Sequence, residues 1–298
     1  MQLVSVIIGT YNGSKYIETQ LQSIIKQSYS NLEIIIVDDA STDNTIEIVE
    51  NIAKGYNHIH VHAYDINVGY IQNFERGIAL ASGKLIALSD QDDWWHPSKI
   101  ESLVEHINDK DLIYCDSAFV NEELQLTGER FSTIKNLFSS TNPLNFLIDN
   151  CVSGHAMLFK KTLFEKAKPF PKLVPHDWWL TYLAALNNGI TYLDKPLVHY
   201  RLHVDNVIAS NTEKKEKVEK LIERNIRLRQ FYNASHSSNH KSEKIVLKFR
   251  DSYNSSTFFS NMKRALLFFK YKKDVLKILK KSEFKKIIFC LNMFFKIK

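Results

Sequence analysis

Three carboxylates lie within four positions at residues 90–93, where the chain reads Asp-Gln-Asp-Asp. They directly follow the apolar run at residues 85–88, which is typical of a buried strand. Left without partners, such close negative charges repel one another and raise the pKa of at least one carboxyl group. A hard divalent cation such as Mg²⁺ or Mn²⁺ binds carboxylate oxygens and bridges them to the phosphates of a substrate. Alone, the cluster fits a metal–diphosphate site and a solvated acidic loop about equally well.

The elements that would position this cluster alternate regularly along the N-terminal half. Strand-like apolar runs occupy residues 3–8, 33–37, 58–62 and 84–88, and helix-like segments lie between them. This alternation predicts an α/β fold whose mostly parallel sheet is covered on both faces. Ligands of such sheets bind beyond the carboxyl ends of the strands. Polar groups stand at three of these ends, at residues 10–12, 38–39 and 90–93.

Other nucleotide-binding classes lack their sequence signatures here. The chain has neither a Gly-x-Gly-x-x-Gly fingerprint nor a Gly-x-x-x-x-Gly-Lys-Ser/Thr loop, which argues against a dinucleotide-binding fold and a P-loop enzyme. The three cysteines are an odd number without framework spacing, which favours reduced thiols in the cytoplasm. The N-terminus has no basic region before its apolar run and is interpreted as a first strand rather than a signal peptide. No apolar run reaches the roughly 18–20 residues that span a bilayer.

The net charge of +6 is unevenly distributed along the chain. Residues 261–298 hold twelve Lys or Arg against two acidic residues, which gives this end +10 and the remaining residues −4. Such asymmetry indicates an anionic partner for the tail, either a membrane surface or a nucleic acid. Nucleic acid is the weaker interpretation, because the tail has no recognised binding motif and the body is acidic.

Two later segments carry further candidate residues. Asp177 precedes Trp178 and Trp179 where a helix is expected to begin, so it is either a helix cap or a catalytic carboxylate. The segment at residues 199–206 follows predicted strands and contains Arg201 and His203. An arginine there could bind a diphosphate through two hydrogen bonds, and an imidazole could ligate a metal.

Taken together, these motifs resemble family 2 of the inverting glycosyltransferases, which have the GT-A fold. The resemblance rests on residues 4–13, 36–43, 67–69, 89–93, 175–179 and 199–206, and it spans about the first two hundred residues. The Asp-Gln-Asp-Asp-Trp variant is similar to bacterial enzymes of O-antigen and capsule synthesis, often rhamnosyltransferases. The resemblance implies a sugar transferase that uses a nucleoside-diphosphate donor and Mn²⁺ or Mg²⁺.

The resemblance also implies individual roles in donor binding. The loop containing Thr10, Tyr11 and Asn12 would line the nucleotide pocket, with Tyr11 stacking on the base. The carboxylate of Asp39 would accept the N3–H of uracil or thymine, and Asp90 would reach the ribose or deoxyribose.

The remaining roles concern the metal, the leaving group and the acceptor. Asp92 and His203 would ligate the metal, and Arg201 would bind the diphosphate. Asp177 would be the base that deprotonates the acceptor hydroxyl during a single displacement. The last three candidate residues, Trp178, Trp179 and Asp93, would bind the acceptor and its sugar.

The predicted division is a catalytic domain at residues 1–210 and a basic amphipathic helical region at residues 211–298. Within the first, residues 1–95 would bind the donor and residues 96–210 the acceptor. The tail is expected either to lie on an anionic membrane or to pack on the catalytic domain, and both can hold together. A membrane partner suits a polyprenyl-diphosphate-linked glycan acceptor and a peripheral position on the inner face of the bacterial cytoplasmic membrane.

Several alternatives remain open at this point. The donor is either dTDP-rhamnose or a UDP-sugar carrying galactose, glucose or an N-acetylhexosamine. A nucleotidyltransferase would also use aspartates and a metal, but its loop after the first strand is normally rich in glycine and basic residues, and this one has a single lysine. A non-catalytic carbohydrate-binding scaffold is disfavoured by the joint presence of Asp39, Asp90, Asp92 and Asp177.

Overall fold

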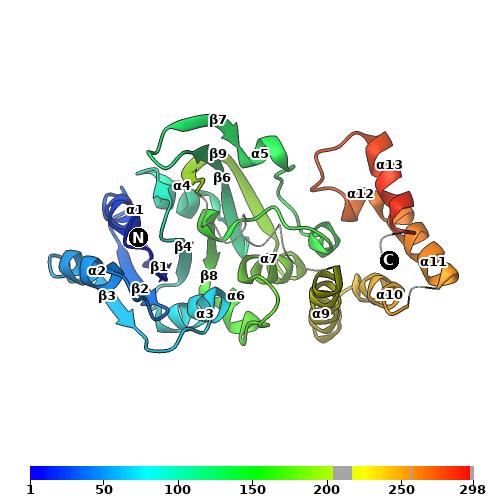
Figure 1. The fold of residues 1–298 in the computed structure, drawn as a ribbon, viewed down its shortest axis with the longest axis horizontal. Coiled ribbons are helices and arrows are strands. Elements are labelled where there is room, and N and C mark those ends of the chain that lie inside the picture. Colours follow the sequence, from blue (N-terminus) through cyan, green and yellow to red (C-terminus); the bar gives the residue numbers. More distant parts are fainter. Residues whose placement is uncertain (204–216, 256, 296–298) are drawn as a thin grey trace.

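The computed structural model describes residues 1–203, 217–255 and 257–295 (Figure 1). One nine-stranded sheet forms its centre. The strands are β1 (Val4–Thr10), β2 (Leu32–Asp38), β3 (Ile59–Ala63), β4 (Leu85–Ser89), β5 (Trp94–Trp95), β6 (Leu112–Val120), β7 (Leu126–Arg130), β8 (Met157–Lys160) and β9 (Ile190–Arg201).

Helices connect and cover these strands. Those of the first two hundred residues are α1 (Ile17–Ile25), α2 (Thr45–Ala53), α3 (Tyr70–Leu80), α4 (Lys99–His106), α5 (Phe131–Ile134), α6 (Lys161–Ala167) and α7 (His176–Leu186), with 3-10 turns η1 (Pro143–Phe146) and η2 (Gly154–Ala156). The C-terminal helices are α9 (Lys217–Ser237), α10 (Glu243–Ser252), α11 (Phe258–Lys270), α12 (Lys272–Val275) and α13 (Glu283–Asn292).

The sheet has two differently built halves. Strands run in the order β3-β2-β1-β4-β8-β6-β9-β5, and the first four are parallel to one another. Strand β8 is antiparallel to both β4 and β6, whereas β9 is parallel to β6. The predicted α/β class and the first four strands are confirmed, and the antiparallel strands of the second half are the additional feature.

Alternating side chains of the strands build a hydrophobic core on each face of the sheet. In β1, Val4, Val6 and Ile8 pack with α1 and α4 on one face. Ile7, which lies between Val6 and Ile8, joins the opposite core together with Phe74 of α3. Because both faces are covered, the parallel strands are almost continuously apolar, as the sequence predicted.

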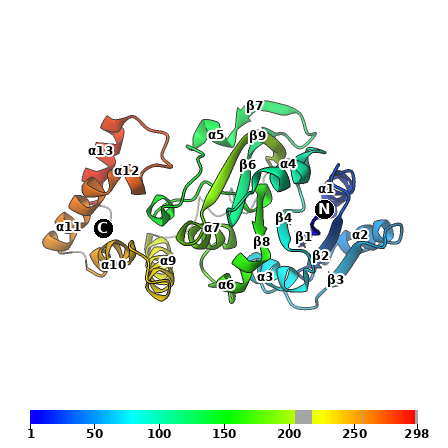
Figure 2. The same cartoon turned by 180° about the vertical axis from the view of Figure 1, so that it is seen from behind.

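The C-terminal helices pack on the sheet-containing part of the chain and share the core that contains Phe74. Both views place α9 beside α7, with the later helices farther from the sheet (Figures 1 and 2). The rings of Tyr182 in α7 and Phe231 in α9 stack with their centroids 3.8 Å apart. The backbone N–H of Asn136 donates to the carbonyl of Ile278 at 2.9 Å, which ties the last helices to the domain. The packed form of the tail is therefore the one observed.

The sequence predicted two boundaries within the chain. The predicted domain boundary between residues 210 and 211 lies outside the described residues. The division between residues 95 and 96 coincides with the end of β5 and stays a prediction. None of the described helices is both long enough and apolar enough to cross a bilayer.

Candidate functional site

The loops after β1 and β4 are joined at the carboxyl edge of the parallel strands. The side chain of Gln91 accepts the backbone N–H of Tyr11 at 2.9 Å and donates to its carbonyl at 3.0 Å. This pairing leaves the ring of Tyr11 about half exposed, as a base-stacking role requires. In the same loop, Asn12 accepts the backbone N–H of Thr42, and Thr10 donates its hydroxyl to Asp38 at 2.7 Å. Thr10 and Asn12 therefore hold the end of β1 against the end of β2 and the segment that follows it.

Asp39 is buried at the end of β2 and is held by three donors. Its Oδ1 accepts the backbone N–H of Val68 at 2.8 Å and the guanidinium of Arg76 at 2.9 Å. Its Oδ2 accepts the N–H of Gly69 at 2.9 Å. Gly69 has a φ of 82°, a conformation that favours glycine. A carboxylate has about four acceptor positions, so Asp39 retains one for a further donor.

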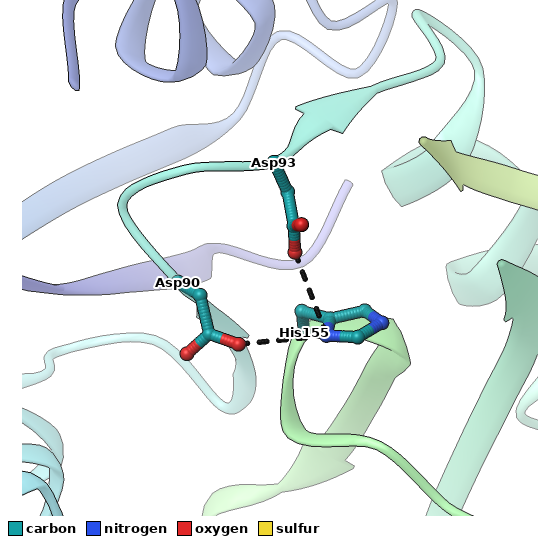
Figure 3. A group of neighbouring side chains, drawn as sticks. All are labelled: Asp90, Asp93 and His155. Atoms are coloured by element: carbon teal, nitrogen blue, oxygen red, sulfur yellow. Dashed lines mark ion pairs between the residues drawn. The ribbon is translucent and has the colours of Figure 1, made fainter. Parts of the chain in front are cut away.

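Asp90 and Asp93, from the loop between β4 and β5, converge with His155 of η2 (Figure 3). The Nδ1 atom of His155 lies 3.4 Å from Asp90 Oδ2 and 3.5 Å from Asp93 Oδ2. One donor atom from each of the three residues lies within 4.8 Å of the others. The other ring nitrogen of His155 contacts the hydroxyl of Ser117 at 2.9 Å, which fixes the orientation of the ring.

The electrostatics of this group favour a cation. Asp93 is fully buried, and its Oδ2 has no hydrogen-bond partner in the described chain. Burial, with added repulsion from Asp92 and Asp90, raises the pKa of Asp93 to about 7. For His155, burial acts against protonation, but the carboxylates of Asp93 and Asp90 raise its pKa above the ordinary value. Two carboxylates and an imidazole are suitable ligands for a divalent cation, so the residues fit the metal that the resemblance implies.

The predicted metal ligands Asp92 and His203 form a second carboxylate–imidazole pair. The Nε2 atom of His203 lies 2.9 Å from Oδ2 of Asp92. The structure therefore brings these two residues together as predicted, but the group of three donors uses Asp90 and Asp93 instead. Asp93, predicted on the acceptor side, lies inside the acidic group, and Asp90, predicted beside the ribose, joins it.

Arg201 supports the loop that carries these carboxylates. Its Nε donates to the carbonyl of Asp92 at 2.8 Å, and its Nη1 donates to the carbonyl of Glu122. Its backbone N–H lies 3.3 Å from Asp93 Oδ1, and its guanidinium lies over the ring of Tyr16. These contacts position the acidic loop, while the role predicted for Arg201 at a diphosphate stays a prediction.

Asp177 lies in the first turn of α7, which packs against the turn that precedes His155. Burial raises the pKa of Asp177 to about 6, although its Oδ1 accepts the backbone N–H of Trp178 at 2.6 Å. A Cβ atom at Gly154 would lie 2.9 Å from His176 Nε2 and 3.8 Å from the Cβ of Asp177. The absent side chain of Gly154 thus lets the turn before His155 pack against the start of α7.

The two tryptophans after Asp177 have different surroundings. The Nε1 of Trp178 donates to the carbonyl of Phe146 at 2.6 Å, and its partly exposed ring faces Arg227. Trp179 is only 7% exposed, because its ring packs against Phe231 and its Nε1 donates to a backbone carbonyl. The ring of Trp178 is therefore accessible to a ligand and that of Trp179 is not, while the role predicted for both beside the acceptor stays a prediction.

Sequence reasoning missed two residues of the site. His155 lies between a glycine and an alanine and showed no ligand spacing. Lys99 is fully buried, donates to the backbone carbonyl of His155 at 2.6 Å and lies over the ring of Trp95. Burial lowers its pKa to about 7. The only available signal for Lys99 was its nearness in sequence to the acidic cluster.

Comparisons with known proteins agree with this geometry. The model of glycosyl transferase family 2 matches residues 5–168, more than half of the chain. The dTDP-rhamnosyl transferase RfbG of Shigella flexneri is 30% identical over 72% of this chain and 78% of its own.

Solved structures share the fold at lower identity. S. aureus TarS in complex with UDP-GlcNAc has a TM-score of 0.64 at 20% identity, covering 99% of this chain and 80% of that one. Mannosyltransferase PcManGT from Pyrobaculum calidifontis, in complex with GDP-Man and Mn²⁺, has a TM-score of 0.55 at 17% identity, covering 99% and 80%. At such identities these two likenesses show the fold alone. With the family model matching more than half of its length, the chain belongs to glycosyltransferase family 2.

Proposed function

We propose that this chain is a metal-dependent, inverting glycosyltransferase that elongates a lipid-linked cell-surface glycan. The observation that carries the proposal is the position of Asp177, whose carboxyl group has a pKa of about 6 and lies in the first turn of α7, against the turn that precedes His155 of the acidic group. A carboxylate with this pKa is deprotonated at neutral pH and basic enough to take a proton from a hydroxyl group.

The nucleoside would bind at the ends of β1 and β2. The exposed ring of Tyr11 offers a stacking surface, and the remaining acceptor position of Asp39 suits the N3–H of a pyrimidine. The similarity to RfbG favours dTDP-rhamnose as the donor. The UDP-GlcNAc bound by TarS supports the alternative of a UDP-sugar, because uracil and thymine present the same N3–H.

A divalent cation would be held by Asp90, Asp93 and His155, with Asp92 and His203 as the second candidate pair. When bound, the metal supplies positive charge next to the diphosphate of the donor. Mn²⁺ is present in the complex of PcManGT, and Mg²⁺ is equally compatible with carboxylate ligands. The chain's own part is to hold the acidic loop through Arg201 and the backbone of His155 through Lys99.

In the transfer step, the acceptor oxygen attacks the anomeric carbon from the side opposite the diphosphate. The new carbon–oxygen bond forms as the bond to the phosphate oxygen breaks, and the bonding electrons leave with the nucleoside diphosphate. Asp177 takes the proton of the acceptor hydroxyl. A single displacement inverts the anomeric configuration, so a β-L-rhamnosyl donor would give an α-L-linkage.

A peripheral position on the inner face of the bacterial cytoplasmic membrane would bring the enzyme to such an acceptor. An aromatic cluster at one end of the C-terminal helices supports this proposal. Phe258 contacts Phe259 and Phe294, and the rings of Phe259 and Phe295 are largely exposed. Exposed aromatic side chains beside many lysines are typical of interfacial helices on anionic membranes.

Nucleotide-dependent thermal stabilisation tests the proposal. The purified chain is melted with UDP, dTDP, GDP or ADP, each with and without Mn²⁺. A ligand at about one hundred times its Kd stabilises a protein by about 2.7 kcal/mol. We expect UDP or dTDP to raise the Tm only when metal is present. If no nucleoside diphosphate raises the Tm under any condition, the proposal is wrong.

Matched variants then identify the metal ligands. Asp93→Asn and Asp92→Asn change the charge equally, and Asp109→Asn does so at an exposed position distant from the acidic loop. Loss of the shift in Asp93→Asn alone assigns the metal to the group with His155. Loss in Asp92→Asn alone assigns it to the pair with His203. The Asp109→Asn control is expected to keep the full shift.

A further inference from the structure

Two arginines of α9 border a cavity between the C-terminal helices and the catalytic domain. The cavity has a volume of about 120 Å³. Arg224 and Arg227 provide its charged lining, and the remainder is mostly apolar, with Leu147 and Ile148 from the catalytic domain and Phe268 and Met293 from α11 and the end of α13.

Both guanidinium groups are placed by aromatic rings. Arg227 lies 3.8 Å from the ring centroid of Trp178, and Arg224 lies 4.2 Å from that of Tyr253. The Nε atoms of both arginines are buried without a hydrogen-bond partner among the described residues. Burial, reinforced by the neighbouring Arg224, lowers the pKa of Arg227 to about 10, so its guanidinium remains charged at neutral pH.

A third arginine of the same region has a purely structural role and serves for comparison. Arg264 is fully buried and donates to three oxygens, the carbonyls of Met293 and Ser252 and the side chain of Asn261. Within the part of the chain that the structure describes, the Nε atoms of Arg224 and Arg227 have no such acceptor. The nearby carboxylate of Asp149, on the catalytic-domain side, is already paired with Lys135 at 2.8 Å.

Two neighbouring guanidinium groups whose buried Nε atoms have no partner among the described residues are suited to a doubly charged anion. Each guanidinium carries five donors in a fixed plane, which matches phosphate oxygens through paired hydrogen bonds. Sulfate-like or carboxylate groups share part of this geometry, but the apolar remainder of the lining requires a ligand that continues into a hydrocarbon. A phosphate ester with an apolar chain meets both requirements.

The location connects this cavity to the proposed catalytic base. Trp178, on which Arg227 lies, directly follows Asp177 in α7. Its indole is fixed by the hydrogen bond to Phe146, the residue before Leu147 of the cavity lining. A ligand held by the two arginines therefore reaches the acceptor side of the site rather than the donor pocket at the ends of β1 and β2.

We propose that Arg224 and Arg227 bind the phosphate or diphosphate group of an acceptor that also carries an apolar chain. This inference rests on the proposed function and specifies the acceptor class of the same site. The sugar of the acceptor would then extend past Trp178 toward Asp177, while the chain follows the apolar lining of the C-terminal helices toward the membrane.

Equilibrium binding of dodecyl diphosphate to the whole chain tests the proposal. The titration is performed by calorimetry with Mn²⁺ and saturating UDP, so that the donor site is already filled. Arg224→Gln and Arg227→Gln are each expected to weaken binding by about tenfold or more, because charged hydrogen bonds are lost. Arg229→Gln is the matched control on the same helix, since Arg229 is exposed, and it is expected to bind like the unmodified chain. Equal affinity in all four proteins would overturn the proposal.

Companion ligands separate the possible sources of the anion. Pyrophosphate without a chain is expected to bind more weakly and to compete with dodecyl diphosphate, and dodecanol is expected not to compete. Vesicles of phosphatidylglycerol are tested in parallel. If Arg224→Gln and Arg227→Gln reduce vesicle binding but leave dodecyl diphosphate binding unchanged, the arginines serve a bilayer headgroup and the acceptor proposal is wrong.

A measurement on the unmodified chain covers the case in which the glutamine variants do not fold. Phenylglyoxal modifies accessible arginines, and mass spectrometry of peptides locates the modified residues. Dodecyl diphosphate is expected to protect Arg224 and Arg227 but not Arg229. Modification of all three at unchanged rates would refute the assignment. The shift with UDP and metal is read separately, so failure of the donor site and failure of this cavity are distinguishable.

Discussion

Replacing Asp177 with Asn should stabilise the protein while it abolishes transfer. The folded state holds this carboxyl group at a pKa of about 6, against an ordinary value of 3.8, because burial disfavours its charged form. The carboxylate therefore destabilises the fold at neutral pH. Asn is nearly isosteric and neutral, and its amide oxygen can still accept the backbone N–H of Trp178.

The magnitude follows from the pKa difference. A difference of about 2 units corresponds to about 3 kcal/mol at the full effect. Asp177 keeps some contact with solvent, which screens the penalty, so we expect a gain of about 1–3 kcal/mol. For a chain of this size, that gain raises the Tm by roughly 2–6 °C.

The sign of the pH dependence provides the sharpest check. Below the unfolded pKa, both states hold the proton and the two proteins are equally stable. As the pH rises through the folded pKa, the unmodified protein loses relative stability, so the difference grows and levels off above it. Linkage predicts about half of the full difference at pH 5 and nearly all of it at pH 8.

The assay is thermal unfolding of Asp177→Asn and the unmodified chain from pH 5 to pH 8, with EDTA to exclude metal effects. Asp65→Asn, at an exposed position in the loop after β3, is the matched control and should change the Tm little at any pH. If the Tm difference for Asp177→Asn is absent at pH 8, or does not grow with pH, burial of the carboxylate does not destabilise the folded state.

Two further substitutions and one pH profile test the proposed donor and acceptor sites. His155→Gln should remove the metal-dependent Tm shift with nucleotide but keep the fold, because Gln can still contact Ser117; an intact shift would exclude His155 as a ligand. Arg76→Gln should weaken UDP binding by about tenfold in calorimetry, since Asp39 loses its ionic partner; unchanged affinity would contradict a role for that carboxylate. In a transfer assay, kcat/KM should rise about tenfold from pH 5 to pH 7 as Asp177 loses its proton, and a flat profile would exclude it as the base.

The first half of the sheet could be predicted because its information is local. Each of the strands β1, β2 and β4 is mostly apolar and is followed by polar residues, and successive strands are connected by one amphipathic helix. Parallel strands place their carboxyl ends at one edge, so the meeting of Tyr11, Asp39 and Asp90 at that edge followed from their positions in sequence.

The second half could not be predicted in the same way. Strand β8 pairs antiparallel with β4 and β6, and both partners precede it by long stretches of chain. Nothing local to residues 151–159 indicates that His155 enters the acidic group. The same holds for Trp95, which pairs with Val198 in β9 and supports the buried ammonium of Lys99. Pairing of distant segments determined these contacts.

The tail illustrates how composition and packing answer different questions. Its composition left open whether it lies on a membrane or packs on the rest of the chain, and the structure buries Leu228 and Phe231 of α9 in the core that also contains α7. A helix whose apolar face is already covered by the catalytic domain cannot also bury that face in a membrane. The proposed membrane contact is therefore left to the exposed aromatic side chains of Phe258 and Phe259, while Arg224 and Arg227 of α9 line the cavity beside Trp178. Under these two proposals, one C-terminal region would both contact the bilayer and bind the anionic group of the acceptor.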